Sequence, residues 1–118
     1  IDSGSGNKVS VPLQFGGSTA TIVALNSANT ASANSTVELS GVIDGESGLT
    51  KYGAGRVVLA GANTYAGVTN VFEGAVQITN ALGLGLGVDN STLHGTFVAM
   101  GSALELNASV PAMSIAGE

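Results

Sequence analysis

The chain has 118 residues and a net charge of −5, and only 9% of its residues are charged, against about 25% in an ordinary globular domain. The absence of cysteine excludes disulfides and thiolate metal sites, and three basic residues are too few for the basic footprint that nucleic acid or an anionic membrane surface requires. No apolar run approaches the ~20 residues of a membrane helix, so we expect no membrane insertion of this segment.

Short segments in which apolar and polar residues alternate recur along the chain, and they predict half-buried strands bounded by Gly, Asn and Ser. No window has the apolar stripe of a helix, and the many Val, Ile, Leu and Thr residues argue against disorder. In chain order the apolar positions of the predicted strands are Val9 and Val11, Ile22 and Ala24, Val37 and Leu39, Val57 and Leu59, Val76 and Ile78, Phe97 with Val98 and Met100, Leu104 and Leu106, and Met113 and Ile115.

The predicted strands recur at an interval of about 20 residues, which is typical of stacked solenoid coils. Residues 37–41 align with residues 57–61, and the series continues from Val57 to Val76 and from Val76 to Val98. A looser match joins residues 75–78 to residues 103–106. A sandwich of β-hairpins also consists of many short strands, so the interval alone does not decide between the two folds.

Two features of the composition favour the solenoid. Aromatic residues make up only 4% of the chain and tryptophan is absent, as expected for a narrow interior lined by aliphatic side chains. Asn, Thr and Ser are frequent at the predicted turns, where their side chains can stack and bond from coil to coil. We therefore predict an all-β chain that forms a β-solenoid with about 20 residues per coil.

One segment resembles a known family. Residues 48–74 read GLTKYGAGRVVLAGANTYAGVTNVFEG, which is similar to the passenger-associated repeat of bacterial autotransporters, also called the autotransporter-associated β-strand repeat. Arg56 and Ala66 depart from the family pattern, which has a small polar residue and Thr or Ser there. The positions that carry the resemblance are Gly48, Leu49, Thr50, Lys51, Gly53, Gly55, Val57, Leu59, Gly61, Asn63, Thr64, Tyr65, Gly67, Thr69 and Gly74.

The resemblance implies a right-handed parallel β-helix that is exported and displayed at, or released from, the bacterial cell surface. Residues 1–118 would then be a single β-solenoid segment of a longer repetitive surface protein. Within the motif, we expect Asn63, Thr64 and Tyr65 to form a corner, with Asn63 bonding to the backbone and Tyr65 packing over the edge rather than contacting a glycan. We expect Lys51 to be solvated and to pair weakly with Glu46 or Asp44.

The sequence contains little that could support catalysis. His94 is the only histidine, and no Gly-x-Ser-x-Gly elbow is present. Glycoside cleavage needs two carboxylates across the scissile bond, and the acids here are scattered. Asp44 and Glu46 form the only acidic cluster, a weak candidate for calcium that is more typical of a solvated loop. We therefore expect no cofactor, no firm metal site and no enzymatic activity.

We accordingly expect a structural or adhesive segment of an exported surface protein, acting as a stalk or a lateral binding surface, with a host-cell surface, a glycan or a matrix protein as candidate partner. Two other hypotheses stay open. The chain could be a carbohydrate-active β-helix, such as a polysaccharide lyase or a phage tailspike. It could also be a subunit of an extracellular filament that associates through solenoid ends, where strand edges are exposed, or through lateral faces.

Overall fold

The computed structural model describes residues 7–15, 20–23, 36–85 and 95–107. All the regular structure in these residues is β-strand, and they contain no helix long and apolar enough to span a bilayer. The strands are β1 (Asn7–Val9), β2 (Leu13–Phe15), β3 (Ala20–Val23), β4 (Thr36–Leu39), β5 (Ile43–Gly45), β6 (Leu49–Tyr52), β7 (Arg56–Leu59), β8 (Thr69–Val71), β9 (Ala75–Ile78), β10 (Thr96–Val98) and β11 (Ala103–Leu106).

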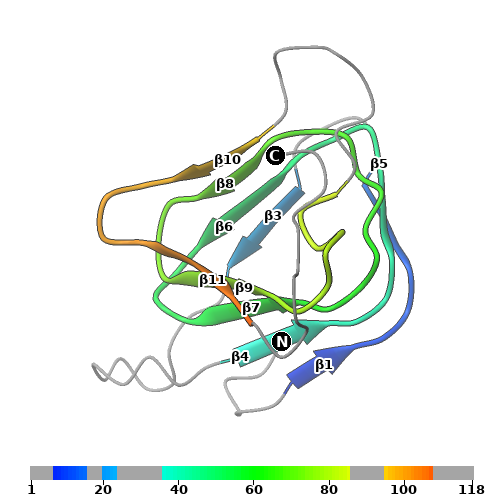
Figure 1. Cartoon of the computed structure of the whole chain (residues 1–118), viewed down its shortest axis with the longest axis horizontal. Coiled ribbons are helices and arrows are strands. Elements are labelled where there is room, and N and C mark those ends of the chain that lie inside the picture. Colours follow the sequence, from blue (N-terminus) through cyan, green and yellow to red (C-terminus); the bar gives the residue numbers. More distant parts are fainter. Residues whose placement is uncertain (1–6, 16–19, 24–35, 86–94, 108–118) are drawn as a thin grey trace.

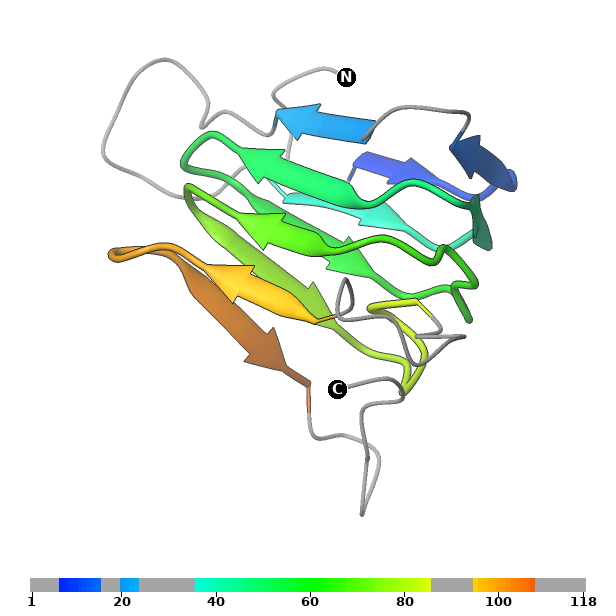
Figure 2. The same cartoon turned by 90° about the horizontal axis from the view of Figure 1, so that it is seen from above.

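The strands lie in three sheets, with orders β1-β4-β7-β9-β11, β3-β6-β8-β10 and β2-β5. The chain places β1–β3 and then β4–β6 in the three sheets in turn, and from β7 on it alternates between the five-stranded and the four-stranded sheet. We call each passage around the molecule a circuit (Figure 1). Every strand pair in the described residues is parallel, and the circuits appear as successive layers in Figure 2. Hairpins would make neighbouring strands antiparallel, so the hairpin sandwich is wrong and the all-β arrangement is compatible with a β-solenoid.

The register confirms part of the predicted repeat. Val57 is paired with Val37 on one side and with Val76 on the other, and the looser match of residues 75–78 to 103–106 is the pairing of β9 with β11. The step from Val76 to Val98 is wrong, because Val98 pairs with Val71 in another sheet. The circuit from β9 to β11 is longer than the central repeats, because extra residues lie between β9 and β10. A step of about one repeat from Val76 therefore ends in β10, partway round the circuit, and not in β11.

Several predicted strand positions fall elsewhere. Val11 lies in a bend between β1 and β2, and Met100 lies in a turn between β10 and β11. Ala24, Met113 and Ile115 lie outside the described residues. The first two circuits are also more widely spaced than predicted, since Val9 pairs with Leu39. The interval of about 20 residues therefore holds for the central circuits only.

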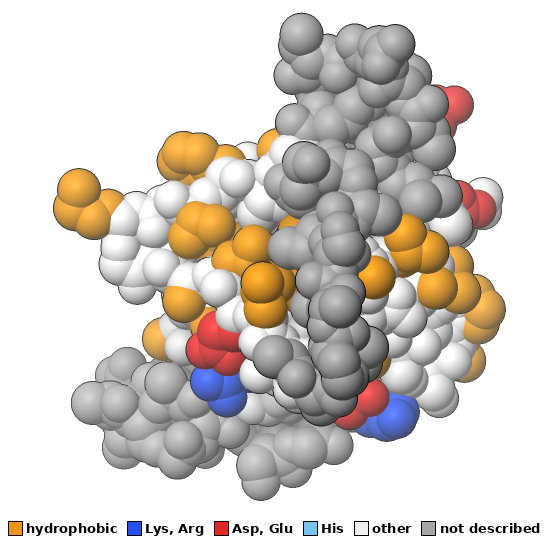
Figure 3. Space-filling model, in the orientation of Figure 1, with side chains coloured by type: hydrophobic (Ala, Val, Ile, Leu, Met, Phe, Trp, Pro, Cys, Tyr) orange, Lys and Arg blue, Asp and Glu red, His pale blue; other side chains and the backbone are white. Residues whose placement is uncertain are grey.

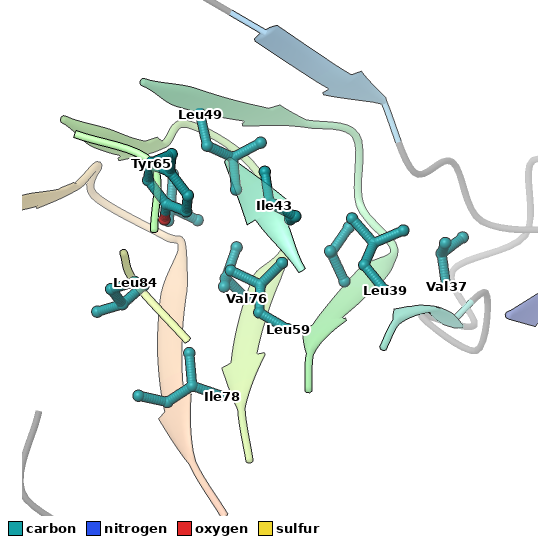
Figure 4. Close-up of a cluster of buried hydrophobic side chains, with 11 residues drawn as sticks. Val37, Leu39, Ile43, Leu49, Leu59, Tyr65, Val76, Ile78 and Leu84 are labelled. Atoms are coloured by element: carbon teal, nitrogen blue, oxygen red, sulfur yellow. The ribbon is translucent and has the colours of Figure 1, made fainter. Parts of the chain in front are cut away.

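The core is a set of aliphatic columns that run from circuit to circuit (Figure 4). Leu39, Leu59 and Ile78 form one column in the five-stranded sheet, and Leu59 and Ile78 are completely buried. Because strand side chains alternate between faces, equivalent positions of paired strands point into the same interior. Each fully buried aliphatic side chain contributes about 1.5–3 kcal/mol. No single circuit could enclose such a core, so its stability depends on its neighbours.

Glycines stand where successive circuits approach most closely. A Cβ atom on Gly61 would lie 2.3 Å from the carbonyl oxygen of Gly41 in the preceding circuit. Gly74 has a φ of +69°, and a Cβ there would lie 2.4 Å from the carbonyl oxygens of Gly53 and Gly55. The glycine spacing of the motif therefore reflects backbone packing between circuits and the sharp corners of the chain.

Candidate functional site

Asn63 lies at the corner between β7 and β8, where the chain runs beside β5 without forming a strand. Its side chain is completely buried. Oδ1 accepts a hydrogen bond of 2.9 Å from the amide of Ile43, and Nδ2 donates one of 2.7 Å to the carbonyl oxygen of Gly83. These partners belong to the preceding and the following circuit. The predicted backbone bonding is confirmed, and the amide side chain supplies the links that a strand would otherwise make.

Tyr65 is in the core, so the prediction that it packs over the edge is wrong. Its side chain is 1% exposed, and its hydroxyl shares a hydrogen bond of 2.6 Å with Oγ1 of Thr69, which is also buried. A Cβ on Gly85 would come within 3.2 Å of the ring, so the next circuit closes directly over it. This burial leaves the ring unavailable to a glycan in the folded chain.

Lys51 is also completely buried, so the prediction that it is solvated and pairs with Glu46 or Asp44 is wrong. It is paired with the core residue Val71, and the alternation along β6 turns its side chain inward. Its ammonium group donates hydrogen bonds of 2.5 to 3.1 Å to the carbonyl oxygens of Tyr52, Gly53 and Glu73. Three backbone oxygens from two circuits thus replace the expected carboxylate partner.

The electrostatics of this corner follow from that geometry. Burial lowers the pKa of Lys51 from 10.5 to about 8, against a smaller opposing effect of the Glu73 charge. The Glu73 carboxylate accepts a hydrogen bond of 2.9 Å from the amide of Gly53. Lys51 and Glu73 therefore fasten the corner of one circuit to the next.

Asp44 lies in β5, and its carboxylate bonds to the next residue and to the neighbouring circuit. Its Oδ1 accepts hydrogen bonds of 2.8 Å from the amide of Gly45 and 3.0 Å from the hydroxyl of Thr64. Glu46 is exposed nearby in sequence. The part of the chain that the structure describes contains no group of three His, Asp or Glu side chains that could hold a metal ion. Asp44 thus makes structural contacts at the end of β5, and Thr64 of the motif contributes one of them.

An aromatic stack on the outer surface escaped the sequence analysis. The rings of Tyr52 and Phe72 are stacked with centroids 5.2 Å apart, and Phe97 follows at 5.7 Å with a tilt of 54°. All three side chains are exposed, on the side of β6, β8 and β10, where hydrophobic side chains are visible in Figure 3. A signal existed, since Tyr52 and Phe72 are separated by the interval of the repeat. Each ring is partly covered by its neighbour, and Phe97 is the most exposed of the three.

A second surface feature is a pocket of about 350 Å³ at the corner between the sheet of β6, β8 and β10 and the five-stranded sheet. Arg56 reaches across β9 to Glu105, with Nε 2.9 Å from Oε2 and Nη2 donating at 3.0 Å to Oε1. Gln77 lies between them and donates to Glu105 at 3.4 Å. The ion pair neutralises both charges in the pocket. The pocket is lined by Ala54, Gly55, Arg56, Gly74, Ala75, Gly101 and Glu105.

The remaining motif positions lie in the same framework. Gly48 and Gly67 stand at a further close approach, where a Cβ on Gly67 would lie 2.2 Å from the amide nitrogen of Gly48. Leu49 and Thr50 are buried in β6. His94 lies outside the described residues.

Comparison with known families supports the resemblance seen in residues 48–74. A family model described as the passenger-associated-transport-repeat matches residues 49–78. No curated protein and no solved structure matches the chain. The matched segment runs from the first residue of β6 to the last residue of β9, and so includes Lys51, Asn63 and Tyr65. Residues 49–78 are therefore an autotransporter passenger repeat.

Proposed function

We propose that this chain is a segment of a right-handed parallel β-helix in an exported autotransporter passenger, and that its role is structural. It would serve as a stalk at the bacterial cell surface, or present one lateral face to a partner. The observation that carries the proposal is the orientation of the polar residues of the repeat. The buried ones, Lys51, Asn63, Tyr65 and Thr69, bond to neighbouring circuits or to each other and not toward solvent.

Three sets of contacts show this orientation of the polar side chains. Asn63 joins the circuits before and after its own. Lys51 holds carbonyl oxygens of two successive corners. Tyr65 and Thr69 satisfy each other inside the core. A catalytic or binding motif needs polar groups within reach of a ligand, whereas these groups are already hydrogen-bonded inside the fold. The chemistry of the repeat is thus suited to holding a stack of circuits together.

For a lateral binding role, the surface we favour is the aromatic stack of Tyr52, Phe72 and Phe97. Sugar rings bind best over open aromatic faces, and here Tyr52 and Phe72 cover each other at 5.2 Å. The exposed apolar surface of the three rings is better suited to an apolar protein surface. Among the candidate partners, a host-cell or matrix protein therefore fits this face better than a glycan.

The enzymatic alternative has less support. The Asp44 carboxylate accepts hydrogen bonds from Gly45 and Thr64, and the Glu105 carboxylate is paired with Arg56. Neither arrangement resembles a proton donor facing a second carboxylate across a sugar. We propose that the segment has no catalytic activity.

A direct test incubates the folded chain with a panel of bacterial and host polysaccharides and measures new reducing ends. We expect none above the level of a heat-unfolded control. Sustained cleavage that disappears in Asp44→Ala or Glu46→Ala would replace the structural role by a carbohydrate-active one.

Export can be tested by grafting residues 36–85 in place of one repeat of an autotransporter passenger that carries a protease-accessible reporter. The graft should keep the reporter at the cell surface. Retention of the reporter inside the cell, with a control graft of a native repeat still exported, would contradict the proposal.

A further inference from the structure

The pocket at the corner between the two larger sheets is built by three successive circuits. Its walls are residues without any side-chain atom beyond Cβ, namely Ala54, Gly55, Gly74, Ala75 and Gly101. They lie at the corners that lead into β7, β9 and β11. A Cβ on Gly101 would meet nothing within 4 Å, so open space remains beside the corner before β11. The hollow of about 350 Å³ thus arises because small residues recur at one corner of the stack.

Arg56 and Glu105 are the two polar side chains among the described lining residues. They form the ion pair that reaches across β9, and their side chains are 39% and 32% exposed. Arg56 uses Nε and Nη2 toward Glu105, so its Nη1 amino group keeps its hydrogen atoms for a ligand. Oε1 of Glu105 accepts one hydrogen bond and, with two lone pairs, has room for another. A donor and an acceptor therefore remain accessible side by side in the pocket.

The fold does not require this ion pair. The register partners of Arg56 in the neighbouring circuits are Thr36 and Ala75, neither of which is charged. An exposed ion pair contributes little to stability, because water already solvates both charges well. Arg56 is thus explained by the pocket better than by the repeat, unlike the buried Lys51 and Asn63.

The size and charge of the pocket indicate its ligand. A volume of about 350 Å³ is near the lower end of the range of ligand pockets, roughly 300–1,000 Å³, and suits a single sugar ring. Because the ion pair is neutral as a whole, it favours an uncharged ligand. Two adjacent hydroxyl groups can accept from Arg56 and donate to Glu105 at once, since a hydroxyl does both. The C–H face of the ring would pack against the alanine and glycine walls.

We propose that this pocket binds one neutral sugar residue, with two adjacent hydroxyl groups held between Arg56 and Glu105. The amide side chain of a protein partner makes the same two kinds of hydrogen bond, but it would leave most of the pocket empty. Among the described lining residues Glu105 has the only carboxylate, so the sugar is bound without the second carboxylate that cleavage needs. The site is separate from the aromatic stack. The proposal goes beyond the structural role, which stands whether or not the pocket is occupied.

Saturation-transfer NMR of the folded chain tests the site with the methyl glycosides of glucose, galactose, mannose and N-acetylglucosamine. The methyl glycosides of glucuronic acid and sialic acid serve as acidic counterparts. We expect transfer to at least one neutral glycoside, and at least ~10-fold weaker binding of both acidic ones, whose carboxylate would face Glu105. No transfer to any neutral glycoside, or equal binding of the acidic ones, would overturn the proposal and leave the structural role intact.

Variants locate the bound sugar. Arg56→Met, which removes the donors, and Ala75→Leu, which fills the pocket, should each weaken binding at least ~10-fold. Ala62→Leu, at an exposed position just beyond the other end of β7, is the matched control and should leave binding unchanged. Glu105→Gln leaves the Arg56 charge uncompensated and should shift the preference to the acidic glycosides. Circular dichroism checks that each variant keeps its β-sheet. Undiminished binding by folded Arg56→Met and Ala75→Leu chains would place the sugar elsewhere and refute the site.

Discussion

Asn63 shows how one side chain can take the place of a strand. Because the chain beside β5 makes no strand in this circuit, the amide of Ile43 and the carbonyl of Gly83 are satisfied by the Asn63 side chain. The amide accepts through Oδ1 and donates through Nδ2, so one side chain serves both partners at once. The repeat therefore needs asparagine at this corner for geometric reasons.

We predict that Asn63→Ala lowers the free energy of unfolding by about 2–4 kcal/mol, since it leaves a buried donor and a buried acceptor without partners. Chemical denaturation followed by circular dichroism measures the change. Asn70→Ala, on the outward side of β8 where the residue is only partly buried, is the control and should shift stability by less than about 1 kcal/mol. Equal losses of stability in the two variants would show that Asn63 does not bridge the circuits.

Lys51 makes stability depend on pH in a defined direction. Its pKa is 10.5 in the unfolded chain and about 8 in the fold, so between these values the unfolded state binds more protons. The contribution of Lys51 to the free energy of unfolding must therefore rise with pH across that window, by at most about 1.4 kcal/mol per pH unit.

The check compares urea denaturation of the chain and of Lys51→Met from pH 7 to pH 10.5. Other titrating groups largely cancel in the difference, which should grow in favour of the lysine chain as pH rises. A difference that is flat or falls would show that the ammonium group is not desolvated by the fold.

The motif predicted the corner from Asn63 to Tyr65 and the backbone bonding of Asn63, but misplaced two side chains. Lysine is usually at the surface, and that general preference outweighed the alternation of Leu49 with Lys51, which places both side chains inside. Tyr65 was misplaced because its corner has no regular period from which a direction could be inferred. Both errors arise where long-range packing overrides local pattern.

At the level of the strands, glycines set how closely circuits can approach. A Cβ at position 61 would overlap the carbonyl oxygen of Gly41, and this oxygen belongs to the backbone and cannot move aside. The same kind of approach recurs at Gly74. Strand spacing and glycine spacing are thus two consequences of one repeat.

We expect Gly61→Ala to destabilise the chain by roughly 3 kcal/mol or more, because the added methyl group pushes two circuits apart. Gly101→Ala is the control. There a Cβ meets nothing within 4 Å, so only its φ of +86° carries a cost, of about 1–2 kcal/mol. Thermal unfolding of both variants measures the difference, and a milder effect at position 61 than at position 101 would contradict the packing argument.

The strands themselves were predictable because alternation is local. The partners of each strand were predictable only where the circuits have equal length. An interval of about 20 residues correctly identifies both partners of Val57. The same interval misplaces Val98, because the extra residues between β9 and β10 shift Val98 to another sheet. The aromatic stack was missed for the same reason, because Phe97 lies off the interval that relates Tyr52 to Phe72.

The stability of the whole molecule is a property of the stack of circuits. Each circuit buries its apolar side chains only against its neighbours, so an added circuit that keeps the register adds an interface and its buried columns. Residues 56–74 form one such unit, because Gly74 precedes Ala75 as Gly55 precedes Arg56, and Arg56 and Ala75 are register partners.

The most direct measurement is the thermal unfolding midpoint of a chain in which residues 56–74 are duplicated in tandem, compared with a chain in which only residues 56–65 are duplicated. The account predicts that the whole-circuit duplication unfolds cooperatively at a midpoint equal to or above that of the original chain. The half-circuit duplication should break the register of every later strand and lower the midpoint sharply. If the whole-circuit duplication were as damaging as the half-circuit one, the stacked-circuit architecture would be contradicted.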